Sequence, residues 1–186
     1  MPLELTTQDT VSAESESLIR VNSADEPQGF LGKTACHDGA GLLHRAFSTF
    51  ILNPAGELLL QRRHPSKRLW PDYWSNSCCS HPRAGEEMDV AVTRRLQQEL
   101  GLGADLEFMF KFEYRAVFED KGTEHELCWV YLGCTPSSPV IDPTEISEWR
   151  WIRAKDLDRE LEQHAERFTP WLKIEWKRLR DDNWVR

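Results

Sequence analysis

GEEMDVAVTRRLQQELG, residues 85–101, is the segment from which the architecture of this chain follows most directly. Its apolar residues recur at every fourth position, at Met88, Val92, Leu96 and Leu100. On an α-helix this spacing places them in one stripe. Gly101 stands where a C-terminal cap is expected, because glycine adopts the left-handed conformation at low cost. The pattern predicts a helix over 85–101 with one side against a core.

Strands are predicted on both sides of this helix. Aromatic residues at even positions alternate with charged ones over 108–118, which is typical of a strand with one buried face. A turn at 119–123 leads into a second strand over 124–132. Further strands are predicted at 18–21, 46–52, 57–62 and 148–152, with 46–52 and 57–62 forming a hairpin around a turn at 53–56.

Two other segments complete the expected order of elements. The loop that contains Pro65, Pro71 and Pro82 is expected to be irregular, because proline breaks regular structure. Thr169 as N-cap and Pro170 as first residue predict a C-terminal helix that runs to about Leu179. Strands interrupted by helices indicate an α/β layered domain.

Length and composition favour one domain over 16–186, behind a flexible tail over 1–15 that is rich in Ser, Thr and Glu. The chain has 186 residues and a net charge of −8, which argues against general nucleic-acid binding. It has no apolar run long enough for a membrane span. With no secretory signal visible and five cysteines that cannot all pair, we expect a cytoplasmic protein with reduced thiols. Monomer and homodimer both remain open.

Histidines and two glutamates suggest a metal site. Glu124 and Glu126 are two residues apart on a predicted strand, so both carboxylates point to the same face, and His125 points to the other. Three further histidines lie near glycine-rich or cysteine-rich loops: His37, His44 and His81. Imidazoles and carboxylates together suit Mn²⁺, Mg²⁺ or Zn²⁺. Solvated glutamates and scattered loop histidines are an alternative that the spacing leaves open.

Residues 61–68, QRRHPSKR, place four cations in a chain that is otherwise acidic, as a phosphate clamp would require. Arg95 lies one helical turn before Glu99, so the two share a face. Cys79 is a candidate proton donor or acceptor, and either it or Cys78 is expected to face the site while the other packs. A solvated basic turn, a surface ion pair and buried structural thiols are the respective alternatives. The last of these is expected for Cys128 and Cys134.

The segment 80–102 resembles the Nudix box, in which a glycine, spaced glutamates, an arginine and aliphatic residues recur in a fixed order. The residues in register are Glu86, Arg94, Leu96, Glu99, Gly101 and Leu102. Ser80, Arg95 and Gln98 depart from the pattern, and the last two replace carboxylates that a diphosphate hydrolase uses to hold metal and activate water. A purely structural amphipathic helix is the alternative.

Together the motifs resemble the type I isopentenyl-diphosphate delta-isomerases, which use a Nudix-like fold. The matching segments are 33–37, 43–48, 62–67, 70–77, 79–82, 85–101, 114–116 and 124–128. The resemblance implies an α/β Nudix-like layered domain with a mixed β-sheet packed between helices. It also implies isomerisation of isopentenyl diphosphate to dimethylallyl diphosphate, a reaction of isoprenoid biosynthesis.

The resemblance further implies roles for individual residues. The implied ligands of one divalent metal are His37, His44, His81, Glu124 and Glu126, with Mn²⁺ or Zn²⁺ as candidates beside Mg²⁺. Glu99 would help to hold a Mg²⁺ bridged to the diphosphate, which would bind Lys33, Arg63, Lys67 and Arg95. Cys79 and Glu126 would transfer protons with Tyr114 hydrogen-bonded nearby, and Trp171 would shield the cation with Trp74 as a second wall.

Two other functions remain as alternatives. A Nudix-type diphosphate hydrolase would need the carboxylates that are missing at Arg95 and Gln98. A non-catalytic metal-binding module would leave Cys79 and the basic loop without a role.

Overall fold

The computed structural model describes residues 11–185, so most of the predicted tail over 1–15 lies outside the described residues. In chain order the strands are β1 Ser17–Val21, β2 Pro27–Gly32, β3 His44–Leu52, β4 Leu58–Arg63, β5 Trp74–Ser75, β6 Cys78–Ser80, β7 Asp105–Phe118, β8 Gly122–Cys134 and β9 Ile146–Ile152. The helices are α1 Lys33–His37, α2 Met88–Leu100, α3 Ala154–Gln163 and α4 Pro170–Asp181, with a 3-10 turn at Ala165–Arg167.

The strand β3 is the centre of a mixed sheet. It runs parallel to β8 from the pair His44 and Glu126 to the pair Leu52 and Cys134, and antiparallel to β6. β7 extends the sheet as the antiparallel partner of β8, whereas β4 pairs with β9, and β1 with β2. The predicted α/β layered fold with a mixed sheet is confirmed.

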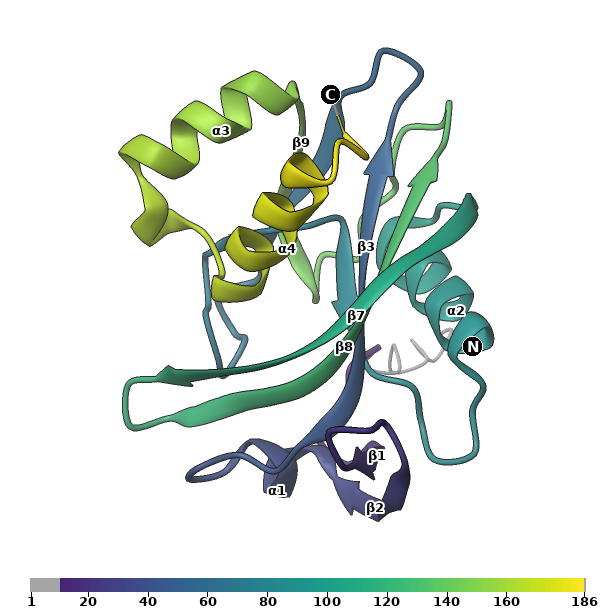
Figure 1. Cartoon of the computed structure of the whole chain (residues 1–186), viewed down its shortest axis with the longest axis vertical. Coiled ribbons are helices and arrows are strands. Elements are labelled where there is room, and N and C mark those ends of the chain that lie inside the picture. The colour runs from purple at the N-terminus through teal and green to yellow at the C-terminus, as the bar shows by residue number, and fades with distance from the viewer. Residues whose placement is uncertain (1–10, 186) are drawn as a thin grey trace, which may run out of the picture.

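Helices cover both faces of this sheet, which creates two cores (Figure 1). On one face, Leu157 of α3 and Trp176 of α4 pack against Phe50 of β3. On the other face, Leu96 of α2 packs in a cluster with Phe47 of β3. Each apolar face of the sheet is therefore covered by a layer of helices. The buried polar residues described below gather at the end of the sheet where α1 lies.

The helix predicted from the opening segment is present but shorter at its start. α2 begins at Met88, three residues later than the predicted Gly85, and its stripe Met88, Val92, Leu96 and Leu100 faces the core. Gly101 has φ of 62° and donates its N–H to Gln97 O, as a C-terminal cap does. A side chain there would also crowd Val140, so both the positive φ and the lack of space require glycine.

The predicted hairpin of 46–52 with 57–62 is confirmed at its turn, but its strands pair there only. Only Leu52 and Leu58 form a pair between β3 and β4. Beyond this pair the two strands separate, because each forms its hydrogen bonds with other strands. β3 pairs with β8 and β6, and β4 pairs with β9. The short turn was read correctly, but the partners of the two strands are set by distant segments.

The alternation predicted over 108–118 is broken at its first residue. A register shift between Phe108 and Phe110 turns Phe108 to the opposite face, where its ring lies 5.2 Å from that of Trp129 and 46 % of the residue is exposed. Phe110 remains in the core with α3 and α4. A β-bulge of this kind leaves no mark in the hydrophobic pattern.

Three local expectations also differ from the structure. The proline-containing loop holds the short strands β5 and β6, because Ser77 Oγ donates to Leu59 O at 2.7 Å and ties the loop to β4. Thr169 precedes α4 but makes no capping hydrogen bond, and its hydroxyl lies 3.2 Å from Ser75 Oγ instead. Cys134 is exposed rather than buried. The sequence reading also missed β2, α1 and α3.

Candidate active site

A pocket that opens to solvent lies where β4, β6 and β8 meet α1 and α2. One part of its lining is formed by His37, His81, Glu124 and Glu126. Another part is formed by Lys67 and Arg95, which share the partner Glu145, and Lys33 lines the pocket as well. The site is therefore divided between a cluster of imidazoles and carboxylates and a cluster of cations.

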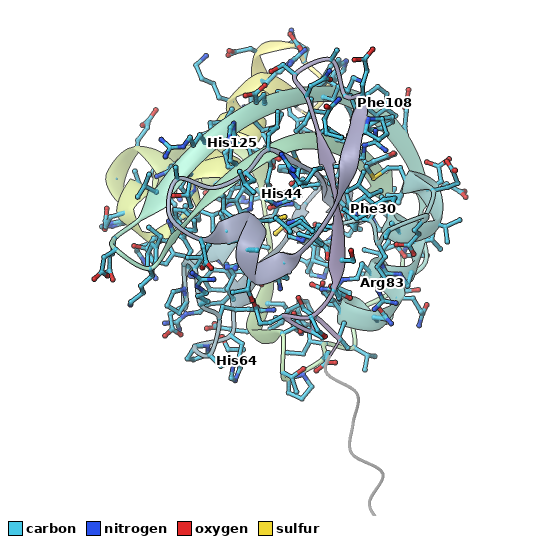
Figure 2. The ribbon with its side chains drawn as sticks, turned by 90° about the horizontal axis from the view of Figure 1, so that it is seen from below. Phe30, His44, His64, Arg83, Phe108 and His125 are labelled. Atoms are coloured by element: carbon cyan, nitrogen blue, oxygen red, sulfur yellow. The ribbon has the colours of Figure 1, made fainter. Side chains whose placement is uncertain are left out.

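The imidazole and carboxylate cluster is assembled from four separate segments. The cluster comprises His37, His44, His81, Glu124 and Glu126, and one ligand atom from each lies within 4.8 Å of those from all the others. β3 and β8 are in register at His44 and Glu126, so the parallel pairing itself brings these two together. Seen from the end where α1 lies, His44 is near the centre of the molecule and His64 at its edge (Figure 2).

Backbone carbonyls orient two of the rings. His37 Nδ1 lies 2.7 Å from Lys33 O, and His44 Nδ1 lies 2.7 Å from Leu42 O. A carbonyl can only accept, so in both rings Nδ1 carries a proton and Nε2 faces the centre of the cluster, where it can ligate a metal ion once it is unprotonated. Hydrogen bonding of the outer nitrogen to a carbonyl is the usual support of a metal-bound histidine.

One nitrogen at the centre of the cluster lacks a partner. His44 Nε2 is buried and makes no hydrogen bond within residues 11–185. His37 Nε2 lies 2.8 Å from Glu124 Oε2, and His81 Nε2 lies 2.8 Å from Glu126 Oε1. Five convergent N and O ligand atoms, one of them unpaired, fit a divalent cation.

The charges of these groups are strongly coupled. Burial would raise the pKa values of Glu124 and Glu126, but neighbouring histidines lower both below the usual range. Burial would likewise lower the pKa of His37, but the Glu124 carboxylate raises it to about 9. Burial and the two neighbouring imidazoles lower the pKa of His81. The cluster therefore keeps both carboxylates ionised and attracts positive charge.

Beside the cluster lie the candidates for proton transfer. Tyr114 Oη donates to Glu126 Oε2 at 2.6 Å, which leaves Glu126 as the acceptor at that end of the pocket. Burial, and then the charge of Glu126, raise the pKa of Tyr114, so the phenol stays protonated. Burial raises the pKa of Cys79 to about 12 although Arg63 opposes the shift, so this thiol also carries its proton at neutral pH. Cys78 points into the core, as the adjacency of the two cysteines predicted.

An aromatic wall closes one side of the pocket. Trp171, at the start of α4, is 3 % exposed, and its indole N–H donates to Ser75 Oγ at 2.9 Å. Trp70 lies edge-on to it, with ring centroids 5.3 Å apart, and the Arg63 guanidinium lies 5.2 Å from the Trp171 ring. Trp74 does not form the second wall that was expected, because it packs in the core on the other side of β4 and β5.

The cations of the pocket are held by hydrogen bonds and ion pairs. Arg95 is 2 % exposed and lies 2.7 Å from Glu99 Oε1, which confirms that the two share a helical face. Arg63 donates to the carbonyls of Leu69 and Trp70 at 2.9 and 3.0 Å, so the loop after β4 fixes its direction. Fixed directions of this kind suit a multidentate anion.

A short N-terminal segment reaches the same cations. Lys33 Nζ donates to Ser12 Oγ at 2.7 Å and lies 3.4 Å from Glu14. Arg95 donates to the carbonyl oxygen of Val11. Residues 11–14, which were expected to belong to a flexible tail, thus place oxygen atoms on two cations of the pocket.

The structure brings every predicted site residue to one pocket or its wall, apart from Trp74. The histidines that were left outside the predicted site, His64, His125 and His164, lie away from it. Gln61 and Arg68, from the basic segment 61–68, also line the pocket, and sequence reasoning missed Glu145. Glu145 directly precedes β9 and lies outside the strand predicted at 148–152, and a buried acid in that position has no periodic signal.

Comparison with known proteins agrees with this geometry. Residues 42–172 match the NUDIX domain family. A solved structure from Deinococcus radiodurans, DR0079, has a TM-score of 0.73 and 24 % identity, with 88 % of this chain and 98 % of that chain covered, which is a likeness of fold. The chain belongs to the NUDIX family.

Related sequences assign the chain to a narrower family within the NUDIX proteins. The Isopentenyl-diphosphate Delta-isomerase 1 of Photorhabdus laumondii is 43 % identical over 163 residues, which are 87 % of this chain and 93 % of that protein. The Isopentenyl-diphosphate Delta-isomerase of Serratia proteamaculans is 42 % identical over 156 residues, with 84 % and 87 % covered. This chain is a member of the isopentenyl-diphosphate Delta-isomerase family.

Proposed function

We propose that this enzyme converts isopentenyl diphosphate into dimethylallyl diphosphate in the pocket described above. The observation that carries the proposal is the division of one pocket between proton-transfer groups at a metal-ligating cluster and a set of cations suited to a diphosphate. Relatives of the same name, with 35–43 % identity, support the reaction.

The reaction moves a double bond by one position. A proton is added to the terminal methylene carbon, which leaves a tertiary carbocation. A proton is then lost from the carbon next to the diphosphate-bearing one, and the electron pair of that C–H bond forms the new double bond. The chain must therefore present one proton donor and one acceptor to different carbons of the substrate.

Cys79 and Glu126 are our candidates for these two groups. Both line the pocket, and they come from different strands, β6 and β8. The hydrogen bond from Tyr114 to Glu126 gives a route by which a proton reaches or leaves this carboxylate. Cys79 Sγ is also 3.8 Å from Ser75 Oγ, which orients the thiol.

A divalent cation would be held by the cluster His37, His44, His81, Glu124 and Glu126, with Zn²⁺ as an ion that the imidazoles suit and Mn²⁺ as one that the carboxylates suit. Glu99 would hold a Mg²⁺ at the cation end together with phosphate oxygens. Bound metal would supply positive charge that holds Glu126 and neutralises the diphosphate.

The remaining residues bind the substrate and exclude water. The basic side chains Lys33, Arg63, Lys67 and Arg95 would bind the diphosphate oxygens. The indole face of Trp171 would lie against the five-carbon chain, where an aromatic ring stabilises a cation by about 1–2 kcal/mol when water is absent. Exclusion of water also prevents its capture by the carbocation.

The compartment that fits this chemistry is the cytoplasm. All five cysteines are free, including Cys79. A reducing compartment keeps such thiols available. No helix among the described residues has the length and apolarity that crossing a membrane would require.

The proposal is tested by isotope incorporation. The protein is incubated with isopentenyl diphosphate and Mg²⁺ in deuterated water, and label is sought in dimethylallyl diphosphate. Cys79→Ala is expected to lower the rate by about 10²–10⁴-fold, because it removes one proton-transfer group. Cys134→Ala is the matched control, since that cysteine is exposed and remote from the pocket.

The outcomes are distinct. Labelled product from the wild type and from the Cys134 variant alone supports the proposal. Release of inorganic phosphate without isomer would identify a hydrolase instead. Full activity of Cys79→Ala would exclude that thiol from proton transfer.

A further inference from the structure

Glu145 is a buried carboxylate in the pocket to which the proposed reaction gives no role. It lies immediately before β9 and is 4 % exposed. Its Oε2 forms an ion pair with Lys67 and lies 3.9 Å from an Arg95 guanidinium nitrogen. Its Oε1 accepts the backbone N–H of Ser12 at 3.1 Å. Glu145 thus contacts the basic loop, the helix α2 and the N-terminal segment at once.

The main chain of Glu145 holds the same loop. His64 N–H donates to Glu145 O at 3.0 Å, and Lys67 N–H donates to His64 O at 3.0 Å. Side chain and backbone together therefore fix both the path of the loop and the end of the Lys67 side chain. A long lysine side chain has several rotamers, and this arrangement retains one of them.

Charge gives a second reason for a carboxylate in this position. Burial lowers the pKa of Lys67, the Glu145 carboxylate opposes this change, and the Arg63 cation adds to it. Arg95 brings a further positive charge, of which Glu99 is the first partner. Without Glu145, like charges would face one another in a mostly buried space, at a cost that ion pairing removes.

Lys67 and Arg95 keep hydrogen-bond donors for a ligand while both are paired with Glu145. The ammonium group of Lys67 has three donors and uses one on Glu145, so others remain for a ligand. The guanidinium group of Arg95 likewise has more donors than its two carboxylate partners occupy. Glu145 can therefore hold both cations while they bind a second, larger anion.

We propose that Glu145 is a positioning residue, which holds Lys67 and Arg95 at the separation and direction that a diphosphate requires. The inference rests on the proposed assignment of these two cations to the diphosphate. Glu145 acts through the cations and touches neither the reacting carbons nor, in this role, the substrate. Its loss should consequently weaken binding of the diphosphate far more than it slows the chemical step.

The test compares Glu145→Gln with Glu148→Gln, in the full chain loaded with divalent metal. Glu148 lies three residues further on, within β9, but is exposed and pairs loosely with Arg62 at 3.5 Å. For Glu145→Gln we expect KM for isopentenyl diphosphate, and Kd for inorganic pyrophosphate, to rise by about tenfold or more, with kcat changed by less than about threefold. Glu148→Gln should leave all three unchanged.

A double-mutant cycle separates positioning from a general structural effect. If Glu145 acts through Lys67, then Glu145→Gln should add little to the loss of pyrophosphate binding already caused by Lys67→Met. Additive losses, a fall in kcat alone, or binding that stays equal or becomes tighter in Glu145→Gln would overturn the inference. Tighter binding would mean that repulsion between Glu145 and the diphosphate outweighs positioning.

Two further outcomes are informative. If Lys67→Met binds pyrophosphate as well as the wild type, the assignment of Lys67 to the diphosphate is wrong, which is a different failure from that of Glu145. If Glu145→Gln does not fold, Glu145→Asp replaces it. Asp keeps the charge but is shorter by one methylene and cannot reach both cations, so weaker binding supports the inference and wild-type binding overturns it.

Discussion

Glu175 offers a quantitative test of how burial of an acid limits the stability of this fold. Its side chain lies on α4 with no exposed surface, and its Oε1 accepts from the Cys128 thiol at 3.4 Å. Its Oε2 has no hydrogen-bond partner within residues 11–185. Burial, assisted by the charge of Glu126, raises the pKa of Glu175 to about 8.

The sign of the effect follows from proton binding. The unfolded chain releases this proton near the ordinary pKa of 4.5, whereas the native protein retains it up to about pH 8. Between these values the native state binds more protons than the unfolded state, so the free energy of unfolding falls as the pH rises. Each pH unit in this range lowers the free energy of unfolding by about 1.4 kcal/mol. Because pH 7 is about 2.5 units above 4.5, the free energy of unfolding at pH 7 is lowered by about 3 kcal/mol.

Glu175→Gln removes this titration. The variant should match the wild type near pH 4.5 and exceed its free energy of unfolding by about 3 kcal/mol at pH 7, with the gap still growing toward pH 8. Guanidinium unfolding followed by tryptophan fluorescence, at a series of pH values and one metal concentration, measures the gap. Because the difference between the two proteins is taken, the pH dependence of metal binding cancels.

Glu162→Gln serves as the control, because Glu162 is exposed on α3. It should show no gap at any pH. A difference between Glu175→Gln and the wild type that is constant from pH 5 to pH 8, or that has the opposite slope, would refute the argument that a buried neutral Glu175 is the cause.

Two further substitutions test the framework of the pocket. Gly122→Ala should lower the free energy of unfolding by about 2 kcal/mol or more and weaken divalent metal binding in titration calorimetry, because the new Cβ would lie 2.6 Å from His37 O at a φ of 154°. Gly103→Ala, with open space around it, should change neither quantity, and equal effects of both would contradict the steric argument. Trp171→Phe should lose about 1–3 kcal/mol in chemical denaturation, because the buried Ser75 loses its indole N–H donor, and unchanged stability would show that this bond contributes nothing net.

Periodicity in the sequence predicted the elements whose apolar residues repeat without interruption. The stripe of α2, the alternation that continues after Phe110 in β7, and the cap at Gly101 all depend on nearest neighbours, so local spacing identifies them. The partners of β3 and β4 could not be found in this way. Pairing between distant strands depends on which faces meet in the core, and the turn between β3 and β4 carries no information about that.

In the candidate site, too, local spacing predicts some of the residues, whereas contacts between distant segments could not be predicted. Glu124 and Glu126 follow from strand alternation, and Arg95 with Glu99 from helical spacing. That His37, His44 and His81 meet them was implied by resemblance to a family, because no spacing rule joins residues from such distant segments. Glu145 was missed because its role depends on three contacts that only the folded chain creates.

The parallel pairing of β3 with β8 also affects how the chain reaches its native state. These strands are far apart in the sequence, so their contact closes a long loop and forms slowly. A slip of one residue would place His125 or Leu127 opposite His44 and turn Glu126 to the other face of the sheet. A divalent ion held by the cluster would need both carboxylates to reach the histidines, so it would stabilise the correct register of β3 and β8 over a slipped one.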